Sequence, residues 1–166
     1  MSKYSDLVAM HTRAWEQSQK TRRGCEGFVN SVIESLMADL EVPESGWAYA
    51  DINAPANKAQ PVGLSEASRF GEDGSVAVRF LVRFGEPPNP VATIVFLLRA
   101  QKEKIGWRVG IDQGPREVVL GDNPPYSRLY QPFVESVSTY LGRDLAWRRG
   151  LGADATEIQV AFGDPG

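Results

Sequence analysis

The strongest hydrophobic signal in the chain is a set of three strand-like runs joined by short loops. They span Ser75–Phe84, Val91–Ala100 and Ile105–Ile111. Side chains alternate between two faces along each run, and residues 85–90 contain three prolines, which cannot continue a strand. The pattern therefore predicts an antiparallel meander over residues 75–111.

The middle run is apolar on both sides of the predicted strand. We expect Phe84 to pair with Val91, so that Ile94 and Phe96 lie on the face opposite to Phe84. An antiparallel strand with one face in water alternates in polarity, and residues 91–98 do not. Both faces at the centre of the sheet therefore need cover, from other parts of the chain or from a partner.

At both ends of the chain, apolar residues recur at the spacing typical of amphipathic helices. A break between two N-terminal helices is predicted at residues 21–24, because Gly24 is unfavourable inside a helix. A third helix is predicted after Tyr126 and ends near Gly142, with Pro132 either in its first turn or at a kink. The residues at helical spacing in the first two helices are Tyr4, Leu7, Val8, His11, Ala14 and Trp15, and then Cys25, Phe28, Val29, Val32, Ile33, Leu36, Met37 and Leu40.

The remaining segments complete an α+β fold. Short strands are predicted within residues 46–52, 116–120 and 157–162. We predict a single domain over residues 1–166: two N-terminal helices, an antiparallel sheet of four to five strands with the meander 75–111 as its core, and a C-terminal helix packed on the sheet. Residues 53–74, rich in glycine and proline, are expected to form a long surface loop with one helical turn, and residues 150–166 a loose C-terminal tail.

Composition and charge narrow the function classes. The 166 residues carry a net charge of −3, which makes nucleic acid an unlikely partner for the chain as a whole. The first 25 residues hold five basic and two acidic side chains, a local charge of +3 that leaves −6 for the rest. One cysteine, no signal-like apolar segment and no run long enough to span a membrane together predict a cytoplasmic protein.

The sequence contains no convincing catalytic or cofactor-binding motif. The single histidine, His11, and the single cysteine, Cys25, both lie on apolar stripes, where they fit better as core residues than as a nucleophile and its base. Residues 150–155 match a dinucleotide-binding glycine pattern, but they neither follow a strand nor open a helix. We therefore expect no bound cofactor or metal, and the balance is against an enzyme.

The favoured function is a non-catalytic interaction or adaptor module. Arginine on an otherwise apolar sheet face is typical of protein interfaces. The module would self-associate as a homodimer or bind a protein partner through one apolar face of the sheet. The predicted partner-binding residues are Arg79, Leu81, Arg83, Ile94, Phe96 and Trp107.

The alternative is a small-molecule-binding protein or enzyme. Its pocket would lie between the sheet and the helices and would be closed by the 53–74 loop. The predicted polar lining is Tyr49, Asp51, Arg108, Asp112 and Tyr126. A third and weaker hypothesis is the docking of phosphate or nucleic acid on the basic N-terminal end.

Overall fold

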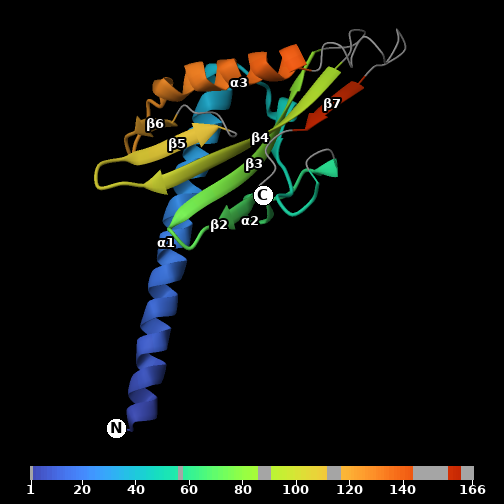
Figure 1. Ribbon diagram of the computed structural model, residues 1–166. Coiled ribbons are helices and arrows are strands. Elements are labelled where there is room, and N and C mark those ends of the chain that lie inside the picture. Colours follow the sequence, from blue (N-terminus) through green and yellow to red (C-terminus); the bar gives the residue numbers. More distant parts are fainter. Residues whose placement is uncertain (1, 56–57, 86–90, 112–116, 144–156, 162–166) are drawn as a thin grey trace.

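The computed structural model describes residues 2–55, 58–85, 91–111, 117–143 and 157–161. A twisted sheet lies against two helices, α1 (Lys3–Asp39) and α3 (Tyr130–Arg143), which cover one of its faces (Figure 1). We call this the helix-covered face and the other the second face. The chain therefore has the predicted α+β architecture.

The sheet is mainly antiparallel. Its order is β1-β3-β4-β5-β6, with β2 also paired to β3 and β7 paired to β4. Only the pairing of β7 with β4 is parallel among those described. The strands are β1 (Trp47–Tyr49), β2 (Ser68–Phe70), β3 (Ser75–Phe84), β4 (Val91–Lys102), β5 (Trp107–Ile111), β6 (Glu117–Leu120) and β7 (Glu157–Ala161).

The predicted register between β3 and β4 is wrong by one residue. Phe84 pairs with Ala92 rather than with Val91, and Phe80 pairs with Phe96. A shift of one residue exchanges the two faces of a strand, because side chains alternate with a period of two. Ile94 and Phe96 therefore lie on the same face as Phe80, under the helices.

The two predicted N-terminal helices are one continuous helix. Ser2 caps α1 by accepting a hydrogen bond from the backbone N–H of Ser5. Gly24, predicted to lie at a break, sits inside the helix with no atom near the position that a Cβ would occupy. A glycine costs only about 1 kcal/mol in a helix interior, which good helix formers on both sides outweigh.

The main core fills the space between the helix-covered face and the two helices. From Cys25 onward, the side of α1 that faces the sheet is buried, whereas residues before Cys25 are exposed or at most half-buried. Phe80, Phe96 and Phe133 of α3 form a contacting aromatic group in the middle of this core. The C-terminal helix is thus packed on the sheet as expected; Pro132 lies in its first turn, and it is shorter than the run of apolar residues suggested.

The second face is covered in part by the segment between β1 and β3. This segment was predicted to be a loop with one helical turn, and it contains α2 (Leu64–Ala67) followed by strand β2. Ala50 and Ala59 pack against Leu81 of β3 and Val95 of β4. Residues 92–98 are all buried, which confirms that both faces of this strand are covered.

Short 3-10 turns, η1 (Glu44–Gly46) and η3 (Ser127–Leu129), lead into β1 and α3 respectively. The last predicted strand is present as β7. Residues 150–156 and 162–166 lie outside the described residues.

Candidate functional site

The six residues predicted to bind a partner do not share one face. Ile94, Phe96 and Trp107 belong to the core under α1 and α3. Arg79 and Leu81 are buried within the second face, and among the six only Arg83 is exposed. The chain itself covers most of this predicted surface, because the true register places half of it beneath the helices.

Arg79 has a structural role that the sequence pattern did not suggest. Its side chain is completely buried, and its Nη1 donates hydrogen bonds to the backbone oxygens of Asp51 and Ala54 at 2.8 and 2.6 Å. A buried charge is tolerated when hydrogen bonds satisfy it. The guanidinium therefore holds the segment after β1 against the second face of the sheet.

The five residues of the predicted polar pocket are also separated. Tyr49 and Tyr126 lie on either side of α1, and Arg108 is an exposed residue of the second face, paired with Glu103 at 2.6 Å. Asp51 uses its side chain to accept a hydrogen bond from the backbone N–H of Asn53. Asp112 lies outside the described residues.

The two tyrosines fix α1 to the sheet from opposite sides. The hydroxyl of Tyr49 donates to Oδ1 of Asn30, and the hydroxyl of Tyr126 is 3.4 Å from that of Ser31. Burial raises the pKa of Tyr49 far above its ordinary range, and the carboxylate of Glu34 raises it further. The Tyr49 hydroxyl therefore stays protonated and remains a donor.

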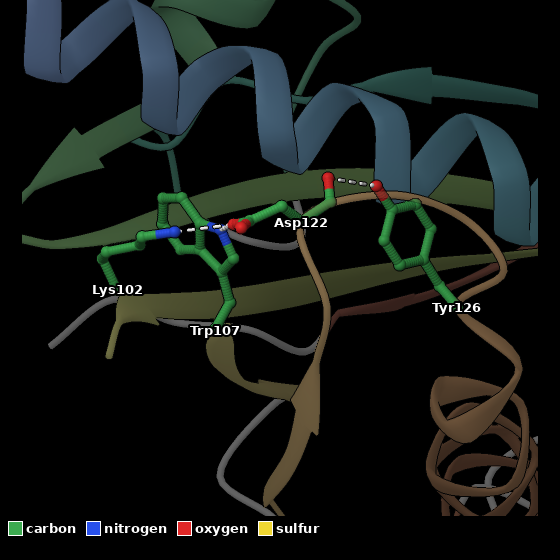
Figure 2. A network of polar contacts seen from close by, with 4 residues as sticks. All are labelled: Lys102, Trp107, Asp122 and Tyr126. Carbon is green, nitrogen blue, oxygen red and sulfur yellow. Dashed lines mark hydrogen bonds and ion pairs between the residues drawn. The ribbon is translucent and has the colours of Figure 1, made fainter. Parts of the chain in front are cut away.

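Polar groups gather around Trp107 at the edge of the core (Figure 2). Oδ1 of Asp122 accepts hydrogen bonds from Nζ of Lys102 at 2.6 Å and from Nε1 of Trp107 at 3.0 Å. These two donors lower the pKa of the Asp122 carboxyl. The backbone oxygen of Asp122 accepts a hydrogen bond from the Tyr126 hydroxyl.

The indole of Trp107 is also stacked against α1. Its ring lies 4.2 Å from that of Phe28 with the planes only 6° apart, and Tyr126 meets Phe28 edge-on. The Trp107 indole N–H and the Tyr126 hydroxyl thus each have a hydrogen-bond partner within the fold, and the exposed Asp122 carboxylate holds the indole in place. We interpret this cluster as an anchor for α1.

His11 and Cys25 cannot form a catalytic pair within one chain. They are 14 residues apart on the same continuous helix, which separates them by roughly 21 Å. Burial raises the pKa of the Cys25 thiol, with a contribution from Glu26 that outweighs the opposing effect of Lys102. The thiol is therefore protonated and poorly reactive near neutral pH.

A groove opens where the end of α1 meets the start of α3. It encloses about 760 Å³ and lies between the segment that follows α1 (residues 40–46), the end of β3 and one side of α3. Most of its lining is apolar: Leu40, Val42, Pro43, Val82, Phe84, Phe133, Val134 and Val137. None of the four described residues of the predicted pocket, Tyr49, Asp51, Arg108 and Tyr126, contributes to it.

The most unusual surface is the N-terminal part of α1, which extends away from the sheet as a lone helix (Figure 1). We call residues 3–21 the projecting half and the rest of the described chain the body. The body begins near Arg22, whose guanidinium lies 4.4 Å from the ring centre of Phe70 on β2. Throughout the projecting half the side chains are exposed, apart from half-buried Ala9 and Gln19.

The projecting half carries an apolar stripe along one side. The large exposed residues include Tyr4 with 76% of its surface accessible, Leu7 with 62% and Trp15 with 58%. Single exposed hydrophobic residues are ordinary, whereas several on one contiguous face mark an interaction surface. The apolar stripe, as the name is used below, consists of Tyr4, Leu7, Val8, His11, Ala14 and Trp15.

The sequence showed this stripe but not its exposure. The spacing of its residues is the same as that of the buried residues further along α1, so the pattern indicated a core face for both. The two groups of residues differ only in their position along α1. The sheet lies beside the helix from about Arg22 onward, so the earlier group stays exposed. A local excess of basic residues before Cys25 was the one signal that distinguished the two parts of the helix.

Neither a metal-ligand cluster nor a membrane-spanning helix is found in the part of the chain that is described. There, no three histidine, cysteine, aspartate or glutamate side chains come together as a metal ion would require. Nor does any described helix combine the length and the apolar character needed to cross a membrane. No protein-family model, no curated protein and no solved structure matches this chain.

Proposed function

We propose that this protein is an interaction module that binds a protein partner through the apolar stripe of the projecting half of α1. The observation that supports it best is the alignment of large exposed side chains on a helix that leaves the body. Most of the stability of a helix in a protein comes from tertiary packing of its amphipathic face. A partner that covers the stripe would supply the packing that the projecting half lacks.

The proposed function is still an interaction module, as the sequence predicted, but its binding surface is the apolar stripe of α1 rather than a face of the sheet. Of the six sheet residues first expected to bind a partner, three lie in the core, Arg79 and Leu81 are buried in the second face, and only Arg83 is exposed. The stripe, by contrast, touches little else in the described chain. Trp15 and Tyr4 are also residue types that are enriched at interfaces.

A site-specific photocrosslinker tests this proposal in cells that make the protein. Benzoylphenylalanine would replace Trp15 within the stripe or, as the matched control, Gln17, which is exposed on another side of the same helix. We expect covalent adducts with protein at position 15 and few at position 17. Equal yields at the two positions, or no adduct at either, would contradict the proposal.

A second candidate function rests on the groove between α1 and α3. Its volume of about 760 Å³ is that of a small-molecule site, and its apolar lining suits an acyl chain or a similar hydrophobic ligand. A thermal-shift screen with fatty acids tests it. A rise of several degrees that is lost in Ser138→Trp, a substitution at the exposed rim of the groove, would favour this function. No shift with any of them would remove it.

A further inference from the structure

We infer that the occupant of the apolar stripe is a second copy of this chain, bound so that the two projecting halves run antiparallel. This inference rests on the proposed function and names its partner. It follows from three features of α1: the side on which the stripe lies, the place where the sheet ends and the distribution of charge.

The stripe faces the same way as the buried side of the body's helix. Residues 4, 8, 11, 15, 18, 22, 25, 29 and 32 follow alternating steps of four and three along one continuous helix. At about 100° per residue, the centre of the stripe and the centre of the sheet-facing residues agree to within roughly 20°. A partner helix on the stripe therefore lies in the layer that the sheet occupies further along α1.

This geometry excludes a parallel pair of such helices. Two packed helices lie about 8–10 Å apart. A parallel second α1, which is itself a helix of 37 residues, would continue past Arg22 and enter the space filled by β2 and β3 of the first copy. In the antiparallel arrangement each body lies beyond the far end of the other chain's projecting half, and neither sheet is entered.

The charges around the stripe permit contact with an identical copy. Between Tyr4 and Trp15 the only charged side chains are Asp6 and Arg13, and both point roughly 140° or more away from the centre of the stripe. Two such stripes can meet without bringing like charges together. A polyanion such as nucleic acid would find no cationic side chain on this surface.

The long-range charge distribution also favours the antiparallel pair. The projecting half holds three basic and two acidic side chains, a net charge of +1, and the remainder of the chain carries −4, so a parallel pair would place two acidic bodies side by side. The antiparallel pair separates the bodies and brings the weakly basic projecting half of each chain toward the acidic body of the other. Such attraction acts over about 8–10 Å at physiological salt.

One register places aromatic residues at both ends of the contact. When Trp15 of one chain lies opposite the partner's Tyr4, Val8 lies opposite the partner's His11, and the two-fold axis repeats both pairs. The contact covers about three helical turns on each chain, which is less than a standard protein interface. We therefore expect a dimer that dissociates in the micromolar range.

Solution mass tests the inference directly. Sedimentation velocity over a wide concentration range should show conversion from a monomer of 18.3 kDa to a species of twice that mass. The double variant Leu7→Glu/Trp15→Glu should remain monomeric, whereas the matched control Met10→Glu/Gln17→Glu, with the same change in charge off the stripe, should still dimerise. The thermal stability of the body should be the same in both, since all four side chains are exposed.

Cysteine cross-linking tests the orientation. In a Cys25→Ala background, Tyr4→Cys and Trp15→Cys should each give little disulfide-linked dimer alone and a strong dimer band when mixed, because a disulfide requires Cα atoms within about 7 Å. Strong self-linking of either variant alone would overturn the antiparallel arrangement. A wild-type chain that stays monomeric would overturn self-association, and stripe-specific adducts with a different protein would then leave the proposed function standing.

Discussion

The contact between Phe28 and Trp107 should be the main attachment of α1 to the sheet, and removing it measures that attachment. Phe28 is buried, stacks on Trp107 with ring centres 4.2 Å apart and receives the edge of Tyr126 at 5.8 Å. Truncating a buried phenylalanine to alanine costs about 3–5 kcal/mol, because apolar contacts are lost and a cavity remains. We expect Phe28→Ala to lower the free energy of unfolding by about 4 kcal/mol.

The same helix provides a matched control. Trp15 is a larger aromatic residue on the same helix, but it is exposed and lies in the projecting half. Trp15→Ala in the monomer should change the free energy of unfolding by less than about 0.5 kcal/mol. Phe28→Leu, which keeps most of the volume and loses the ring stacking, should fall between the two.

Urea unfolding followed by circular dichroism gives the required free energies. For a chain of this length, 1 kcal/mol corresponds to a shift in melting temperature of about 2–4 °C, so Phe28→Ala should melt about 8–16 °C lower. A loss below 1 kcal/mol for Phe28→Ala would refute the reasoning, because it would mean that α1 is not held at this point. A large loss for Trp15→Ala would show that the projecting half is not separate from the body.

Three further predictions follow from single residues. Gly24→Ala should raise the free energy of unfolding by about 1 kcal/mol, measured with urea, because the added methyl group meets no atom within 4 Å inside a helix. Gly106→Ala should markedly lower the melting temperature, because this residue has a φ of +77° and its new Cβ would lie 2.3 Å from the carbonyl oxygen of Leu120. The pKa of Asp122 is lowered below its ordinary 3.8 by its donors, first Lys102, so its contribution is present above that value and is lost as the pH falls below it. A urea series from pH 6 to pH 2 should therefore be less steep for Asp122→Asn than for the wild type, and equal slopes would count against this role.

The helices show what the sequence could predict and where it failed. The apolar spacing identified both parts of α1, because amphipathic periodicity is a local property of the chain. The break predicted at Gly24 is absent, since the energetic cost of one glycine is small beside the cooperative extension of a helix from both sides. Propensity alone could not decide between one helix and two.

The strands show a different limit. The three runs of the meander were located correctly, but the register between β3 and β4 was not, because the connecting residues 85–90 do not define which residues face each other. A shift from Val91 to Ala92 as the partner of Phe84 moved Phe96 from a predicted surface into the core. The set of residues predicted to share an interface therefore depended on the pairing assumed between β3 and β4.

The candidate site could not be located from the sequence for a related reason. The stripe around Leu7 and the buried residues after Cys25 follow the same spacing, and no local property says which part has a sheet beside it. Arg79 was read as an interface residue, whereas it donates to backbone oxygens of a segment 25–28 residues earlier in the chain. Contacts of that kind depend on the whole tertiary structure.

The continuity of α1 has a mechanical consequence. A helix of 37 residues is a rod of roughly 55 Å, and this one is clamped along its C-terminal part by the body while its other end is unsupported. A force or a tilt imposed near Tyr4 reaches Phe28 and Trp107 without passing through any hinge. The helix is first supported where Arg22 meets Phe70, so a partner bound at the far end of the rod would also load the packing of Phe28 on Trp107 beyond that point.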